Sequence, residues 1–135
     1  MQRSLDDRVV EIATLASING FPFGAPASDL VELAGPPDEA LTNYTGEFET
    51  LYGDCFYRFY ADRFVEFTAP DTYRFRVDDI DVLSIFDWLG AQPDRVDRAR
   101  FRISRAHGIA YDYRDPEHGS ITVFEAGRWD TLLEG

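Results

Sequence analysis

The sequence predicts an α+β protein built from two tandem repeats, each a short helix followed by a three- to four-stranded antiparallel meander, with the helices on one face of the sheet. Two segments carry this prediction because they align without a gap at an offset of 55 residues: DLVELAG at 29–35 and SIFDWLG at 84–90. FVEFTA at 64–69 also matches ITVFEA at 121–126 at an offset of 57, and self-similarity of this kind indicates a duplicated unit. We therefore expect one compact domain of 135 residues with repeat units at approximately 20–77 and 78–135.

The first unit is expected to begin with a helix. Pro26 suits an early helical position, and Gly35 supplies the left-handed residue that ends many helices. Four candidate strands follow, at 47–52, 55–60, 63–68 and 72–77. The GD and AD pairs that separate the first three strands are typical of tight hairpin turns.

The second unit repeats this plan. Asp81 is a good N-cap residue, and Gly90 is expected to end the helix. The apolar residues between them follow the i, i+3, i+4, i+7 spacing of one helical face: Val82, Ile85, Phe86 and Leu89. The candidate strands of this unit lie at 99–104, 108–113, 120–125 and 128–133. Residues 1–17 fit either a helix or a strand.

The charge of the chain disfavours several classes of partner. It carries 25 acidic residues against 13 basic ones, all arginine, for a net charge of −12. Such an acidic excess repels the phosphates of nucleic acid and the anionic surface of a membrane, whereas it speeds encounter with a basic protein. No apolar run approaches the roughly 20 residues of a membrane span, and the N-terminus lacks the apolar block of a secretory signal. These features predict a cytoplasmic protein.

The stretch CFYRFYADRFVEF at 55–67 predicts aromatic side chains on both faces of the sheet, because its aromatic residues fall on both alternation parities. One parity is apolar or amphipathic and is assigned beneath the helices: Cys55, Tyr57, Phe59, Val65 and Phe67. The other parity mixes rings and charges, and the neighbouring strand adds two acids: Glu47, Glu49, Phe56, Arg58, Tyr60, Phe64 and Glu66. Tyr, Phe and Arg are enriched at binding interfaces, so these seven residues are the candidate partner-binding surface. Cross-strand pairing that merely stabilises the sheet, or a covering N-terminal segment, would also explain the pattern.

Residues that carry chemistry are sparse. His107 and His118 sit at predicted turns with no second ligand at metal-binding spacing. Asp78, Asp79 and Asp81 fit solvated acids before a helix better than a calcium loop, and Cys55 is predicted to be an inert buried thiol. We therefore expect no catalytic residues, no metal and no cofactor, and the chain is predicted not to be an enzyme.

The segment INGFPFGAPASDLVELAGPPDE at 18–39 resembles the opening of many small bacterial domains, with a glycine, a short helix and a terminal glycine–proline. Similar units occur in the beta-lactamase inhibitory protein and in the outer-membrane assembly lipoproteins. Resemblance to the former implies duplicated helix-plus-sheet units and an inhibitor that grips an enzyme with its sheet face. In size, acidity and lack of catalytic groups the chain is also similar to the immunity proteins that neutralise bacterial toxins.

These observations favour a non-catalytic inhibitor, an immunity protein that binds a basic bacterial toxin domain through an acidic, aromatic sheet face. The alternative is a small-molecule-binding domain with a pocket between helices and sheet. Trp88 and Trp129 would then be candidate lining residues, although both also suit a core position.

Overall fold

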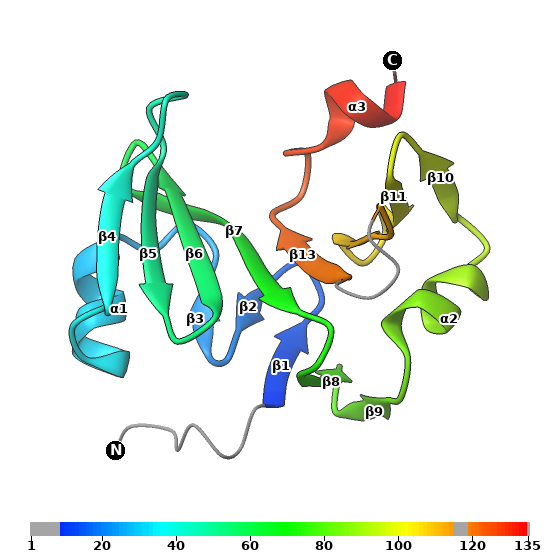
Figure 1. The fold of residues 1–135 in the computed structure, drawn as a ribbon, viewed down its shortest axis with the longest axis horizontal. Coiled ribbons are helices and arrows are strands. Elements are labelled where there is room, and N and C mark those ends of the chain that lie inside the picture. The colour runs from blue at the N-terminus through cyan, green and yellow to red at the C-terminus, as the bar shows by residue number, and fades with distance from the viewer. Residues whose placement is uncertain (1–8, 115–118, 135) are drawn as a thin grey trace.

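A computed structural model of the chain describes residues 9–114 and 119–134, which form two β-sheets and three helices (Figure 1). The larger sheet is antiparallel throughout and has eight strands, in the order β10 (Val96–Arg98), β11 (Phe101–Ser104), β12 (Ile109–Asp112), β13 (Ser120–Phe124), β7 (Arg63–Pro70), β6 (Cys55–Tyr60), β5 (Phe48–Tyr52) and β4 (Glu39–Thr42). The smaller sheet has five strands, in the order β3 (Phe21–Pro22), β2 (Ser17–Ile18), β1 (Val9–Ala13), β8 (Arg74–Val77) and β9 (Ile80–Val82). The helices are α1 (Ala27–Ala34), α2 (Ile85–Gly90) and α3 (Asp130–Glu134).

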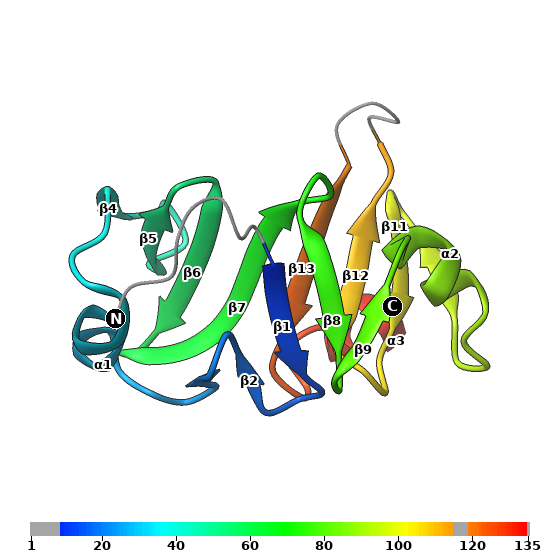
Figure 2. The ribbon, with the colours of Figure 1, turned by 90° about the horizontal axis from the view of Figure 1, so that it is seen from below.

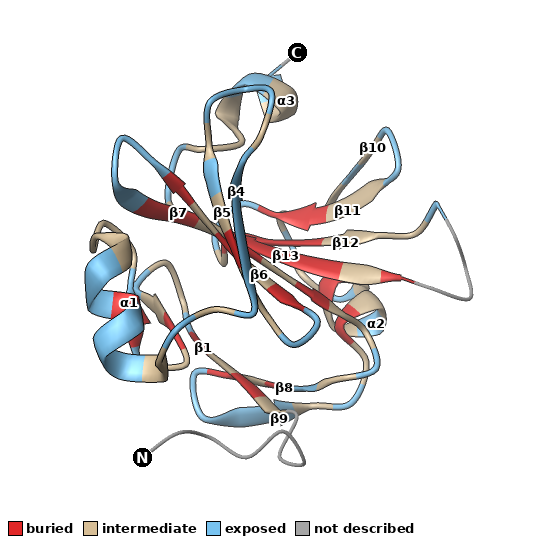
Figure 3. Ribbon diagram, turned by 60° about the vertical axis from the view of Figure 1, so that its left-hand side comes forward, coloured by how far each residue is buried: buried red, intermediate tan, exposed pale blue. Residues whose placement is uncertain are grey.

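The two sheets pack on each other with the main core between them. Seen from below, β1, β8 and β9 lie in front of the larger sheet, while α1 and α2 stand at opposite ends (Figure 2). Both sheets contribute to one buried cluster, which joins Val10 of β1 and Phe75 of β8 to Phe67 of β7 and Ile121 of β13. The buried residues form a band across the larger sheet (Figure 3). We call the side of this sheet that faces the smaller sheet the inner face, and the opposite side the outer face.

The outer face is covered over only part of its width. A second small cluster there consists of Ile103, Ala110 and Phe124, and Trp129 and Leu132 of the C-terminal segment pack against it. Helix α3 therefore shields the half of the sheet that contains β10–β13 and lies away from β4–β6 (Figure 1). The outer face of β4–β7 is the part of the sheet that helix α3 does not shield.

The predicted fold class is wrong. Strands make up 45% of the described residues and helices 16%, and the architecture is two large sheets instead of two helix-plus-meander repeats. The segment 72–77, predicted as the last strand of the first meander, forms β8 and pairs in parallel with β1 in the smaller sheet. Parallel pairing joins residues far apart in the chain, so no local turn signal announces it.

Two further boundaries differ from the sequence prediction. Asp81 belongs to β9 and does not cap α2; the N-cap is Ser84, whose Oγ accepts the N–H of Asp87 at 3.2 Å. The segment predicted as a strand at 128–133 instead turns into α3, on the opposite face of the sheet from the main core. Gly35 ends α1 as predicted, with a φ of 85°.

A β-bulge between β6 and β7 changes which ring faces the core. Arg58 pairs with Glu66, but the next residue, Phe59, pairs with Phe64, so β7 holds one extra residue. The shift brings Phe64 to the inner face, where it is 0% exposed and stacks on Phe23 with ring centroids 4.7 Å apart. The predicted placement of Phe64 on the exposed face is therefore wrong, because strict alternation does not hold across a bulge.

Candidate interaction surface

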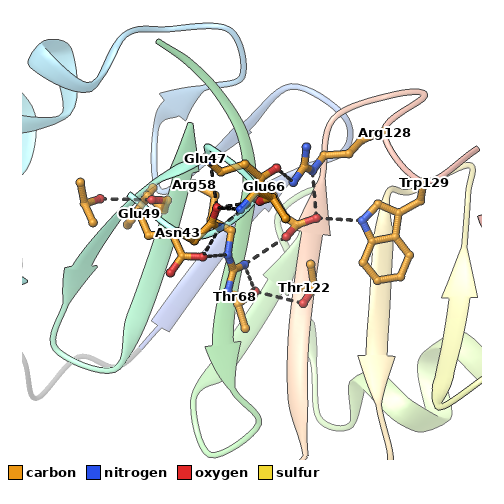
Figure 4. A network of polar contacts seen from close by, with 12 residues as sticks. Asn43, Glu47, Glu49, Arg58, Glu66, Thr68, Thr122, Arg128 and Trp129 are labelled. Atoms are coloured by element: carbon orange, nitrogen blue, oxygen red, sulfur yellow. Dashed lines mark hydrogen bonds and ion pairs between the residues drawn. The ribbon is translucent and has the colours of Figure 1, made fainter. Parts of the chain in front are cut away.

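An ion-paired network occupies the outer face of β5, β6 and β7 (Figure 4). Arg58 of β6 is at its centre: Nε donates to Glu49 at 2.9 Å, and Nη1 donates to Glu66 at 3.1 Å. The same Nη1 lies 2.7 Å from the hydroxyl of Thr68. These strands place the four side chains on one face because their positions are directly paired across the ladder or two residues apart along β7.

A second arginine joins the C-terminal segment to this network. Arg128, in the turn before α3, donates Nε to Glu66 at 3.0 Å and forms a close ion pair with Glu47. Trp129 Nε1 donates to the same Glu66 oxygen at 2.8 Å. Three glutamates and two arginines therefore alternate across the surface, and the network as a whole carries a charge of about −1.

The network is half-buried, and two of its members, Glu47 and Arg128, are held in their charged forms. Burial alone would raise the pKa of Glu47, but the hydrogen bond and the charge of Arg128 hold that pKa below its usual value. Burial opposes the charge of Arg128 as well, yet Glu66 and Glu47 keep the pKa of its guanidinium raised. Asn43 adds a neutral support, because its amide nitrogen donates to Glu47 and Glu49.

The structure brings together most of the residues predicted from the sequence to bind a partner. Glu47, Glu49, Arg58 and Glu66 belong to the network, and Phe56 lies beneath Arg58, with the guanidinium carbon 5.5 Å from the ring centroid. Tyr60, the last residue of β6, lies two residues after Arg58 and is 57% exposed. Phe64 does not belong to the surface. The acids are largely neutralised by arginines, which the sequence prediction did not foresee.

Sequence analysis missed the most exposed apolar residues of this region. Tyr44 is fully exposed in the β4–β5 turn, and Leu41 of β4 is 50% exposed. Leu41 pairs with Glu49 and Tyr60 lies two residues after Arg58, so both are on the outer face at one end of β4–β6. Phe48 pairs with the buried Phe59 and lies at the margin of the inner face. We call the set Leu41, Tyr44 and Tyr60 the β4–β5 patch. Leu41 and Tyr44 were missed because no strand was predicted between Gly35 and residue 47, whereas Tyr60 was among the residues predicted to bind a partner.

Two hollows lie elsewhere. An open groove of about 630 Å³ beside α3 is lined by Arg98, Phe101, Arg128, Trp129, Thr131 and Leu132. A smaller cavity of about 170 Å³ lies between α2 and the strands, and in it the hydroxyl of Tyr111 donates to Asp71 at 2.6 Å. Of the two tryptophans considered as pocket residues, Trp129 lines the groove, whereas Trp88 packs against the core and the ring of His107.

Ser104, His107 and Asp94 are the residue types of a catalytic triad, but they are not arranged in the order of one. Ser104 Oγ lies 2.9 Å from Asp94 and 2.8 Å from His107 Nδ1, so the serine stands between the other two. A nucleophilic triad places the histidine between serine and acid, and its serine is accessible, whereas Ser104 is 0% exposed. Burial would raise the pKa of Asp94, but the N–H of Ala106 and the Ser104 hydroxyl hold that pKa low. The group fastens the β11–β12 turn.

The remaining residues considered as a nucleophile or as metal ligands are buried or make contacts that hold the fold together. Cys55 is buried, and desolvation raises its pKa to about 11, which makes the thiol a poor nucleophile at neutral pH. Asp78 accepts the N–H and hydroxyl of Thr14, and Asp81 pairs with Arg76. Among residues 9–114 and 119–134 no three His, Cys, Asp or Glu side chains gather as metal ligands. His118 lies outside the described residues.

Within those same ranges, the helices are too short and too polar for any of them to cross a membrane. No family model matches the chain, and neither a search of curated proteins nor a search of solved structures finds a match.

Proposed function

We propose that the chain is a non-catalytic protein-binding inhibitor of the immunity type, which binds a basic bacterial toxin domain through the β4–β5 patch and the adjoining acids. The observation that carries the proposal is the presence of three exposed apolar side chains, Leu41, Tyr44 and Tyr60, at one end of β4–β6, beside the ion-paired network. Exposed apolar groups that lie together mark interaction sites more often than scattered ones do. Tyrosines such as Tyr44 and Tyr60 are also frequent energetic hot spots.

The charge of this half of the molecule supports a basic partner. Residues 9–57 contain eight acidic residues and no basic residue, and they supply α1, β4 and β5. Asp38 and Glu39 are exposed at the start of β4. A partner that presents lysine or arginine would be drawn to this side at long range, which raises the association rate more than the final affinity.

The network contributes side chains that are already held in place, and it adds little unpaired charge to the surface. Because Glu47, Glu49 and Glu66 are already held by Arg58 and Arg128, their side chains lose little conformational freedom when a partner binds. The exposed rings of the patch then supply most of the contact area. The proposed binding surface therefore has a rigid polar centre with exposed apolar side chains along one side.

The proposal is tested by capturing a partner with the tagged full-length protein from a lysate of its native organism, then purifying that partner. We expect a basic protein whose activity is lost on addition of an equimolar amount of this chain. Tyr44→Ala and Tyr60→Ala should each weaken the affinity about tenfold or more, measured by calorimetry. The association rate should fall steeply as salt is added.

Matched controls lie in β9 of the other sheet and directly after it. Ile80 and Leu83 are 68% and fully exposed, so Ile80→Ala and Leu83→Ala remove comparable apolar surface away from the patch. These two changes should leave the affinity within about twofold of the original. An unchanged affinity of the Tyr44 and Tyr60 variants would overturn the proposal, as would a partner that keeps its activity when bound.

A second candidate function, small-molecule binding, draws support from the groove beside α3. Phe101, Trp129 and Leu132 provide apolar walls, and Arg98 lies at its margin. A groove with few convergent polar groups suits an apolar ligand with an anionic end. A thermal-shift screen with aromatic and aliphatic carboxylates tests it: stabilisation that Trp129→Ala abolishes would support this function, and no stabilisation by any of them would contradict it.

A further inference from the structure

The edge strand β4 differs from the other sheet edges of the described structure. All four of its residues are exposed, and its pairing with β5 runs without a bulge. It contains no proline and no basic residue. Natural proteins usually protect such an edge with lysine, proline, a bulge or a covering segment, because the unpaired backbone groups invite another strand.

The other edges carry such protection. At the opposite end of the same sheet, β10 has only three residues and includes a basic one, Arg98, whose Nη1 donates to the carbonyl of Leu132 in the C-terminal segment. In the smaller sheet β3 has two residues and ends with Pro22, and β9 has only three residues, too few to pair with a long added strand. The open character of β4 is therefore a local feature and not a general property of the molecule.

The ladder between β4 and β5 shows which backbone groups point outward. The N–H of Asn43 donates to the carbonyl of Glu47 at 2.8 Å, which marks these two residues as a hydrogen-bonded pair. In an antiparallel ladder such pairs alternate with non-bonded ones, so Leu41 also directs its backbone groups toward β5. Ala40 and Thr42 consequently direct their N–H and C=O groups away from the sheet, and no described residue bonds to them.

From this geometry we infer that β4 accepts an extended, lysine- or arginine-rich segment of the partner as a ninth strand of the larger sheet. The inference rests on the proposed function and specifies how the partner is held. The backbone of that segment bonds to Ala40 and Thr42. On the outer face its basic side chains lie beside Glu39, and its apolar side chains lie beside Leu41 and Tyr44, as favourable cross-strand neighbours.

Charge selects this occupant over a second copy of the chain. Each copy carries a net charge of −12, and among the described residues no arginine forms an ion pair with Asp38 or Glu39 at the start of β4. Two such edges repel each other, whereas a basic segment neutralises Asp38 and Glu39 as it docks. We therefore expect the isolated chain to sediment as a monomer at low micromolar concentration, and a dimer dissolved by a β4 substitution would overturn the inference.

The test uses synthetic peptides of roughly eight residues, the length of an ordinary strand. One carries lysine and valine in turn at every second position, so that both lie on the outer face, with threonine at the positions between them. A second has the same sequence with N-methyl groups on one backbone edge, and a third replaces lysine with glutamate. We expect the first to bind the full-length protein and to shift the amide signals of Ala40 and Thr42 in NMR spectra. The N-methylated and glutamate peptides should bind at least about tenfold more weakly. Equal binding of the first two peptides would overturn the inference.

A variant of the protein gives an independent check. Ala40→Pro removes one outward N–H, and the β region that proline imposes on Glu39 is already the conformation of a strand. Ala40→Thr retains the N–H and is the matched control. We expect only the proline variant to lose its affinity for the lysine–valine peptide. Undiminished binding by that variant would contradict strand addition. Should the proline variant not fold, the N-methylated peptide still decides the question.

The captured partner separates this inference from the proposed function. If Tyr44→Ala and Tyr60→Ala weaken its binding while Ala40→Pro does not, the patch binds the partner but β4 does not accept a strand. If all three changes weaken binding, both conclusions stand. If none does, the patch and the edge are both excluded as the binding site.

Discussion

Arg128 and Glu66, 62 residues apart in the chain, are joined by a hydrogen bond of 3.0 Å between Nε and Oε1. The carboxylate of Glu66 also accepts from Arg58 and from the indole of Trp129, so it connects β6, β7 and the start of α3. The outer face therefore has two roles that meet at one residue. The network fastens the C-terminal segment to the sheet, and it forms the rigid centre of the proposed interaction surface.

Replacing Glu66 should destabilise the protein markedly. Glu66→Ala leaves Arg58, Arg128 and the Trp129 N–H without their common acceptor, at a site where the Glu66 side chain is only 12% exposed. We expect the free energy of unfolding to fall by about 2 to 3 kcal/mol, as is usual when one partner of a partly buried pair is removed. Urea denaturation measures the change. Glu39→Ala, at an exposed acid of β4, should alter stability by less than about 0.5 kcal/mol.

Replacing the two aromatic residues next to the bulge should change the free energy of unfolding to very different extents. Phe64 is fully buried among Phe21, Phe23 and Tyr57, so Phe64→Ala should lower the free energy of unfolding by about 3 to 5 kcal/mol. Tyr60 is mostly exposed, and Tyr60→Ala should change it by less than about 0.5 kcal/mol. Chemical denaturation of both variants tests the bulge directly. Similar small effects at both positions would mean that Phe64 lies on the outer face after all.

Gly119 should not tolerate a side chain. A Cβ at this position would lie 2.0 Å from Tyr111 Oη and 2.5 Å from its Cζ, which forces the ring or the backbone to move. Gly119→Ala should therefore destabilise the protein by about 1 to 3 kcal/mol in thermal or urea unfolding. Gly90→Ala is the matched control, because the added methyl meets only the flexible end of Arg102 and lies in α2. A Gly119 variant as stable as the control would contradict the packing around Tyr111.

Individual strands could be predicted from the sequence because local patterns define them. The run 55–60 alternates in burial as expected, with Cys55, Tyr57 and Phe59 on the inner face. Sheet membership could not be predicted in the same way. The pairing of β1 with β8 depends on the burial of both strands in a shared core, and neither strand has a sequence feature that names its partner.

The site was predicted in part for the same reason. Glu49, Arg58 and Glu66 lie on paired positions of consecutive hairpin strands, so alternation alone places them together. Arg128 and Trp129 come from a segment that looked like a strand, and only the tertiary fold brings them to Glu66. A signal was available in the sequence, since GRW at 127–129 combines a turn glycine with residues that often make long-range polar contacts.

The pair Tyr111–Asp71 predicts how stability depends on alkaline pH. Burial and the neighbouring Asp71 carboxylate raise the pKa of Tyr111 to about 12, above the value of about 10 for an unfolded chain. The folded protein therefore holds this proton more tightly, and the associated stability is complete below about pH 10 and is lost as the pH rises toward about 12. Because the buried Cys55 thiol titrates in a similar range, the decisive quantity is the difference between the original chain and Tyr111→Phe.

At pH 8 the Tyr111→Phe variant should be about 1 kcal/mol less stable, since it lacks the hydrogen bond to Asp71. Above about pH 10 the difference between the two proteins should shrink, because only the original chain loses stability through ionisation of Tyr111. Urea titrations at intervals between about pH 8 and pH 11 measure both curves. Parallel curves over this range would show that Tyr111 ionises equally easily in the folded and unfolded chains, and thus that its hydroxyl does not donate to Asp71.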